Sequence, residues 1–288
     1  MSIMTGKVVR SIIKMSKTGK QRVGVALSGG SALGIAHIGV LQSLRDHDIP
    51  IDCIAGTSAG AIVAACYAFG VPMEKVTETA RKLSWYNIPK LSFSGLGLFS
   101  HAALAKFIEE FLKDAKIEDA TIPLSIVAAD LETGERVIFR KGSLIKALTA
   151  SASIPGFFIP VEVGGHLLVD GGLVDNLPFF ALSEMGATTK VGVNVNRWIS
   201  RRQPKNLLDV ATRSMEIAIT YLHPLAKNEI LIEPHLEGFT PSDFSKAEGL
   251  VRAGYQAASL SIKEIRTMAG KRIPRVSWWE NFRNWFDE

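Results

Sequence analysis

The sequence predicts an α/β protein with a mostly parallel central sheet and helices on both faces. Short apolar runs rich in Val, Ile and Ala alternate along the chain with longer segments of helical periodicity. This alternation is typical of parallel strands joined by crossover helices. In addition, no internal repeat and no Pro- or Ser-rich linker divides the 288 residues. We therefore expect one domain over about residues 22–270, between an arm (1–21) and a tail (271–288).

The first third of the domain contains two predicted strands, each followed by helix. "RVGVALS" (22–28) has the composition of a buried strand, and the amphipathic segment 32–48 follows it as a helix. "IDCIA" (51–55) is the second short apolar run, and good helix formers follow it, so we expect helices near 59–69 and 73–84. Each strand passes into its helix through small residues, which indicates tight turns.

The middle of the domain begins with an irregular segment. Residues 87–100 have no period and mix Gly and Ser with apolar side chains, which predicts a surface loop, and a helix near 101–113 follows. The stretch 123–142 predicts two strands about a turn, and 143–153 a helix. "HLLVDGGLVDNLP" (166–178) predicts a strand that runs into a tight Asp-Gly-Gly turn.

The last third repeats the alternation of strand and helix. "TKVGVNV" (189–195) and "EILIEP" (229–234) predict strands, and helices are expected near 206–222 and 244–269. This order completes the α/β pattern.

Charge is concentrated in the N-terminal arm. Residues 1–22 carry six Lys or Arg and no acid, and the rest of the chain holds 27 basic against 28 acidic residues. The folded body is therefore not a basic nucleic-acid-binding domain, and we expect no nucleic-acid partner. The arm lacks the apolar core of a signal peptide. Cys53 and Cys66 lie in apolar stretches without metal-ligand spacing, which predicts buried free thiols in a reducing, cytoplasmic compartment.

An uncharged run of 21 residues, 53–73, is long enough to cross a bilayer. Three glycines, Thr57, Ser58 and Pro72 interrupt it. A strand, a tight turn and a buried helix explain the run better than one continuous span, so we predict no transmembrane segment.

Ser58 stands between two glycines in "GTSAG" (56–60), where one apolar run ends and the next begins. The glycines allow the backbone to turn sharply between strand and helix. Such a turn lifts the serine Oγ out of the sheet and places it at a helix N-terminus, where N–H groups favour negative charge. The pattern predicts a nucleophile, and the alternative is a turn needed only for packing.

A second glycine-rich stretch, "LSGGSALG" (27–34), follows the first predicted strand. It is not a Walker loop, because Ile-Ala stands where Lys-Ser/Thr is required, and Ser31 replaces the middle glycine of a dinucleotide fingerprint. Small residues here can point several N–H groups at one spot. Gly29, Gly30 and Ser31 are therefore candidate oxyanion-hole donors, and a plain strand-to-helix turn is the alternative.

Ser58 needs a base, and two kinds of residue can supply one. His235 would complete a Ser-Asp-His order like that of α/β-hydrolases. Alternatively a carboxylate acts directly, and Asp170 in "DGG" ends a strand where it can face the crevice at the carboxyl ends of the strands. As a bare motif, Asp-Gly indicates only a turn. The competing residues are His223, Asp130, which we expect to support a Glu-Thr-Gly turn, and Asp175.

Taken together, these segments resemble the patatin-like phospholipases. The resemblance covers about residues 22–197 and rests on "SGGSALGIAHIGVL", "GTSAG", "AADLETGERVIF" and "SASIPGFFIPVEVGGHLLVDGGLVDNLP", in this order and spacing. It implies a patatin-like three-layer sandwich and a Ser-Asp dyad, with Ser58 as nucleophile and Asp170 as general base. It also implies that loop 28–34 supplies oxyanion-hole N–H groups. The supporting glycines of these motifs are Gly34, Gly56, Gly60, Gly171 and Gly172.

Two positions depart from the family pattern. Ser31 stands where the family has glycine, and serine tolerates positive φ less well. Leu33 stands where the family has a basic residue, so a cation that would assist an anionic intermediate is absent. The departures leave a backbone oxyanion hole possible but bear on substrate preference and rate. Leu33 favours the alternative of a weakly active or inactive lipid-binding or regulatory protein with this fold.

The resemblance thus implies a serine acyl hydrolase of the phospholipase or lysophospholipase type. Its substrate would be a lipid or lysophospholipid, and its chemistry needs no metal and no cofactor.

Three segments outside these motifs predict contact with lipid. Segment 87–100 has the composition of an apolar flap over the acyl site, and a loop simply folded onto the core is the alternative. In the tail, Trp278, Trp279, Phe282, Trp285 and Phe286 form one helical stripe. Indoles beside basic residues suit a membrane interface, and the basic arm adds to the attraction. We therefore expect a cytoplasmic protein, peripheral to the membrane through both termini, with docking of the tail on the domain as the alternative.

Overall fold

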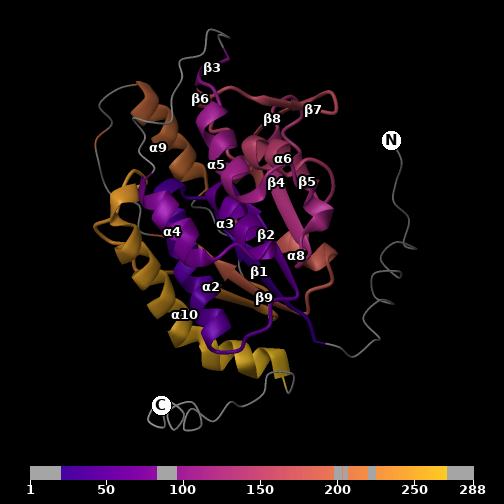
Figure 1. The fold of residues 1–288 in the computed structure, drawn as a ribbon, viewed down its shortest axis with the longest axis vertical. Coiled ribbons are helices and arrows are strands. Elements are labelled where there is room, and N and C mark those ends of the chain that lie inside the picture. The colour runs from indigo at the N-terminus through magenta and orange to yellow at the C-terminus, as the bar shows by residue number, and fades with distance from the viewer. Residues whose placement is uncertain (1–20, 83–95, 198–202, 204–206, 220–224, 271–288) are drawn as a thin grey trace, which may run out of the picture.

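The computed structural model describes residues 21–82, 96–197, 203, 207–219 and 225–270 (Figure 1). Most of the basic arm, residues 87–95 of the predicted flap, His223 and the aromatic tail therefore lie outside the described residues, and the expectations attached to them stay predictions. Within the described residues no helix is both long enough and apolar enough to cross a membrane.

The core of the molecule is an eight-stranded sheet of mixed direction. Its parallel part has the order β10–β9–β1–β2–β4, and every neighbouring pair in it is parallel. These strands are β1 (Val23–Leu27), β2 (Cys53–Thr57), β4 (Leu124–Asp130), β9 (Thr189–Val193) and β10 (Glu229–Ile232). The antiparallel part consists of β5 (Arg136–Phe139), β7 (Val161–Val163) and β8 (His166–Asp170).

Both faces of the sheet carry helices because its central strands have apolar side chains on both faces. Val23, Val25 and Leu27 of β1 belong to the larger core, and Ala26 belongs to a smaller one. The helices over the larger core are α2 (Ala36–Asp46), α3 (Ala59–Ala68), α4 (Met73–Lys82) and α10 (Ala247–Ala269). Helix α8 (Phe179–Glu184) covers the smaller one (Figure 1). The predicted fold class is confirmed.

Helices α2 and α10 pack with their backbones in contact. A Cβ at Gly39 in α2 would lie 1.8 Å from the Val251 carbonyl oxygen, and one at Gly254 in α10 would lie 1.9 Å from the Ala36 carbonyl oxygen. Only glycine fits at either position, so the two helices approach more closely than side chains normally allow.

The remaining elements are short or peripheral: η2 (Ser31–Ile35), β3 (Gly97–Phe99), α5 (Ala102–Leu112), η4 (Ile117–Asp119), α6 (Leu144–Ser151), β6 (Gly156–Phe158), α7 (Gly172–Asp175), α9 (Leu207–Ile219) and η5 (Phe244–Lys246). The helix expected over 32–48 begins as the 3₁₀ turn η2 and ends at Asp46. The segment expected as a loop contains β3, which pairs in parallel with β6. Elements of three or four residues, such as β6, β7 and α7, are too short to show a period, and α8 likewise was not predicted.

Candidate active site

Ser58 lies at the turn between β2 and α3 in an uncommon backbone conformation. Its φ is 52° and its ψ is −124°, in the half of conformational space that non-glycine residues rarely enter. Such strain persists only where the surrounding structure enforces it. A Cβ at Gly60 would lie 2.4 Å from the Leu27 carbonyl oxygen, and one at Gly56 would lie 2.5 Å from the Ala61 Cα. The two glycines of the motif thus let β1, β2 and α3 meet tightly around the serine.

Strand β4 brings Asp170 to Ser58. One edge of β4 pairs with β5. The other edge pairs with β2 over its first part, which ends where Thr57 lies opposite Val127. The same edge then pairs with β8, beginning where Asp170 lies opposite Ala128. Because β2 and β8 run in opposite directions along this edge, their carboxyl ends meet at consecutive positions of β4. This register places the residue after β2 beside the last residue of β8.

The Asp170 carboxylate is buried, with 2% of the residue exposed. The Ser58 hydroxyl lies close enough to this carboxylate to lower its pKa, and Asp170 Oδ1 accepts a hydrogen bond from the Gly172 N–H at 2.8 Å. Burial raises the pKa of Asp170 to about 6, because desolvation of the charge outweighs the opposing effects of the Ser58 hydroxyl and the Gly172 N–H. The carboxylate is therefore a stronger base than an exposed aspartate while remaining ionised above neutral pH.

Ser151 in α6 holds the peptide group at the turn that carries Ser58 (56–60), which we call the elbow. The Ser58 N–H donates to Ser151 Oγ at 2.8 Å, and Ser151 Oγ donates to the Val127 carbonyl oxygen at 2.6 Å. Sequence reasoning missed this residue, because a serine in a short helix has no pattern of its own.

The glycine-rich loop faces the elbow. Some of its backbone N–H groups donate hydrogen bonds to other parts of the protein, and others do not. The Gly29 N–H donates to Asn176 Oδ1 at 3.1 Å, and the Ala32 N–H donates to the Pro241 carbonyl oxygen at 3.1 Å. The N–H groups between them, of Gly30 and Ser31, make no hydrogen bond to another residue in the part of the chain that the structure describes. These two N–H groups are therefore available to donate to a bound ligand.

The two departures from the family pattern take different structural forms. Ser31 has a φ of 53°, the conformation that glycine adopts more easily. Leu33 is 5% exposed and belongs to the main core, so its side chain adds apolar packing where the family has a cation.

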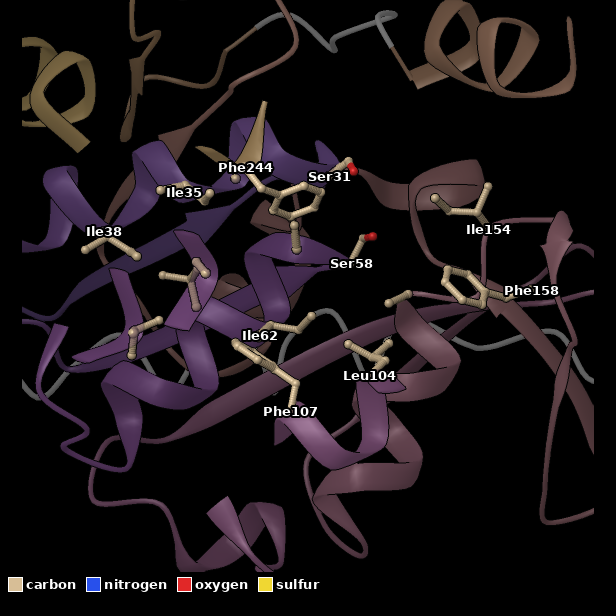
Figure 2. Close-up of a pocket in the computed structure, with 16 residues that line it drawn as sticks. Ser31, Ile35, Ile38, Ser58, Ile62, Leu104, Phe107, Ile154, Phe158 and Phe244 are labelled. Carbon is tan, nitrogen blue, oxygen red and sulfur yellow. The ribbon is translucent and has the colours of Figure 1, made fainter. Parts of the chain in front are cut away.

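An apolar cavity of about 130 Å³ opens beside Ser58. Figure 2 shows the Ser58 side chain among apolar residues from η2, α2, α3, α5 and β6. The largest side chains that line the cavity are those of Ile35, Ile38, Ile62, Leu104, Phe107, Ile154, Phe158 and, next to Ser31, Phe244. Such a lining fits a hydrocarbon chain and gives an extended polar ligand little to bind.

The competing candidates have other surroundings. His235 has an imidazole that is 66% exposed and lies 3.6 Å from the Glu237 carboxylate. Asp130 accepts hydrogen bonds from the Glu132 and Thr133 N–H groups and from His166, so it supports the turn as expected. Asp175 forms an ion pair with Arg136. Within the described ranges no three His, Cys, Asp or Glu side chains gather as metal ligands would.

Several curated proteins are similar to this chain in sequence. An uncharacterized NTE family protein of Mycobacterium tuberculosis is 35% identical over 187 residues, which are 64% of this chain and 52% of that protein. The patatin-like phospholipase domain-containing protein 6 of Homo sapiens is 25% identical over 81% of this chain and 20% of its own length. The chain thus spans about half the length of the mycobacterial relative.

Among solved structures, VipD from Legionella pneumophila has the same fold. It superposes with a TM-score of 0.51 at 16% identity, over 85% of this chain and 67% of its own. The family model for patatin-like phospholipase matches residues 25–183, which include both glycine-rich turns and the Asp-Gly-Gly motif. The chain belongs to the patatin-like phospholipase family.

Proposed function

We propose that the protein is a serine acyl hydrolase of the phospholipase or lysophospholipase type, with Ser58 and Asp170 as its catalytic dyad. The observation that carries the proposal is the register of β2 and β8 on β4, which places the Ser58 hydroxyl beside the buried Asp170 carboxylate, close enough to lower its pKa. Membership of the family supports hydrolysis of lipid esters.

In the first half of the reaction Asp170 accepts the Ser58 proton as Ser58 Oγ attacks the carbonyl carbon of the ester. The C–O bond to the leaving alcohol then breaks, and Asp170 returns the proton to that alcohol. In the second half Asp170 takes a proton from water, the resulting hydroxide attacks the acyl-enzyme, and the fatty acid leaves as Ser58 recovers its proton. The nearness of the Ser58 hydroxyl to the Asp170 carboxylate supports this direct transfer.

Negative charge develops on the carbonyl oxygen in both halves. The N–H groups of Gly30 and Ser31 are the donors that we assign to it, since the Gly29 N–H is held by Asn176. Gly29 then acts by its small size: a Cβ there would lie 2.7 Å from Asn176 Oδ1 and 3.2 Å from the Ser58 Cβ. Losing one such donor costs other hydrolases on the order of 10²- to 10³-fold in kcat.

The apolar cavity serves as the site for the acyl chain, and filling it should change chain-length preference. Ala80 in α4 lines the cavity and is 6% exposed. In the Ala80→Leu variant we expect kcat/KM for long-chain p-nitrophenyl esters to fall about tenfold, the effect of blocking one or two methylene sites. The acetyl ester, which does not reach this wall, should be hydrolysed at the wild-type rate. An equal loss on both esters would contradict the assignment.

The pH dependence of kcat/KM should show one ionisation on its acid side. Because Asp170 must be ionised to accept a proton, activity should rise with pH through an apparent pKa of about 6 and then stay level. A Ser-Asp-His triad based on His235 would lose this activity in the His235→Ala variant, whereas the dyad predicts an unchanged profile. Initial rates on a soluble ester between pH 4.5 and 9 measure both.

One experiment tests the proposal as a whole. The protein is incubated with a fluorophosphonate probe, and the modified peptide is identified by mass spectrometry. We expect labelling at Ser58, together with release of fatty acid from phospholipid or lysophospholipid vesicles. A folded protein that neither reacts with the probe nor releases fatty acid would instead be the inactive lipid-binding form of the fold.

A further inference from the structure

The Gly30 and Ser31 N–H groups can stabilise an oxyanion only if their peptide planes are held in position before the reaction. A peptide between two glycines has unusual freedom to rotate, because neither residue has a Cβ that restricts it. The Gly29–Gly30 peptide is such a group. Contacts outside the loop must therefore fix it.

A side-chain amide holds this peptide from its carbonyl side. Asn196 Nδ2 donates to the Gly29 carbonyl oxygen at 2.7 Å. No cis peptide occurs among the described residues, and in a trans peptide the N–H points away from the C=O. Fixing the Gly29 carbonyl toward Asn196 therefore turns the Gly30 N–H in the opposite direction.

Asn196 is itself held firmly. It follows β9, is 6% exposed, and its own N–H donates to Asn194 Oδ1 at 3.0 Å. Its Nδ2 also lies 3.4 Å from Ser28 Oγ, which accepts the Val195 N–H at 3.1 Å. The segment after β9 and the loop after β1 are thereby joined by several hydrogen bonds in a buried place, where such bonds are strongest.

The preceding peptide is held in the same manner. His37 Nε2 donates to the Ser28 carbonyl oxygen at 2.7 Å, while the Gly29 N–H on the other side of that peptide donates to Asn176 Oδ1. With the Ser28–Gly29 peptide fixed at both ends, the contact from Asn196 determines the orientation of the next one.

We propose that Asn196 is a positioning residue of the oxyanion hole, which orients the Gly30 N–H through the Gly29 carbonyl without touching the substrate. This assignment rests on the function proposed above. It gives a role in the reaction to a residue outside the serine, aspartate and glycine motifs.

The Asn196→Asp variant tests it, because it keeps the shape of the side chain and replaces the donor with an acceptor that repels the Gly29 oxygen. We expect kcat for a p-nitrophenyl butyrate substrate to fall roughly 10²-fold, with KM nearly unchanged. A trifluoromethyl ketone, whose adduct with Ser58 places an oxyanion in the hole, should lose affinity by the same factor. A long-chain alcohol, which fills the acyl cavity but forms no oxyanion, should inhibit variant and wild type equally.

Asn228→Asp is the matched control. Asn228 Nδ2 also donates to a backbone carbonyl oxygen, that of Thr188 at 3.2 Å, but it lies at the amino ends of β9 and β10. This variant should retain wild-type kinetics. If the buried charge of Asn196→Asp prevents folding, Asn196→Ala removes the same donor without a charge and is expected to show the same selective losses.

The outcomes separate the two proposals. An active wild type with an equally active, folded Asn196 variant overturns the positioning role and leaves the proposed function intact. Parallel losses of kcat, ketone binding and alcohol binding also overturn it, because they indicate a merely structural residue. A wild type that neither hydrolyses esters nor binds the ketone overturns the proposed function itself.

Discussion

We expect the Ser58→Ala variant to lose ester hydrolysis by on the order of 10⁵-fold or more, because alanine has no hydroxyl with which to form the acyl-enzyme. The fold should survive, since the hydroxyl is small and Ser58 belongs to none of the apolar core clusters. Initial rates on p-nitrophenyl butyrate and thermal unfolding monitored by circular dichroism measure the two effects. The fluorophosphonate probe should label the wild type and not the variant.

Two further variants complete this test. Ser43→Ala removes another buried hydroxyl, which is bonded to Ser259 in α10, and should retain full activity. Ser58→Gly should be as inactive as Ser58→Ala but more stable than it by about 1 kcal/mol, because glycine removes the strain at a φ of 52°. Retention of wild-type rates by Ser58→Ala would reduce the elbow to a packing turn.

The second large effect is expected on replacing the base. Asp170→Asn keeps the shape of the side chain but cannot accept the Ser58 proton, so kcat should fall by roughly 10³-fold or more, as when a triad member is lost. The same change should make the protein more stable at high pH. The pKa of Asp170 rises from 3.8 to about 6 on folding, so the folded state binds this proton more tightly than the unfolded state does. The resulting stabilisation is complete below pH 3.8 and is lost as the pH rises through 6.

The variant carries no buried charge and should exceed the wild type by up to about 3 kcal/mol in free energy of unfolding at pH 8, with the difference shrinking toward pH 4. Urea unfolding at the two pH values measures it. Asp130→Asn is the matched control, and its expected change in stability has the opposite sign. The His166 and turn N–H contacts lower the pKa of Asp130, so this variant should keep its activity and be less stable than the wild type at neutral pH. An Asp170→Asn variant that was stabilised but hydrolysed esters at the wild-type rate would disprove the role of Asp170 as general base.

The sequence was sufficient to predict the strands and helices that are long enough to show a period, and the small-residue turns at which Ser58 and Asp170 lie. It was not sufficient to predict how these turns meet. Their contact depends on β8 running antiparallel along the edge of β4 that β2 vacates, and no local pattern encodes the direction of a strand. The residues that hold the loop were missed for a similar reason. Asn176 and Asn196 bond to Gly29 across 147 and 167 positions, and buried asparagines at such distances have no sequence signature.

The glycine contact between α2 and α10 limits how this protein can vary over evolutionary time. Helix α2 continues directly from η2, which begins at Ser31 in the glycine-rich loop, so its position determines that of the loop. With the two backbones in contact at Gly39 and Gly254, no side chain between them can change size to absorb a shift. A substitution that moves α10 therefore has to be compensated by a substitution in α2. We expect the sequences of the two helices to change together between related proteins, even though α10 lies outside residues 25–183, which the family model matches.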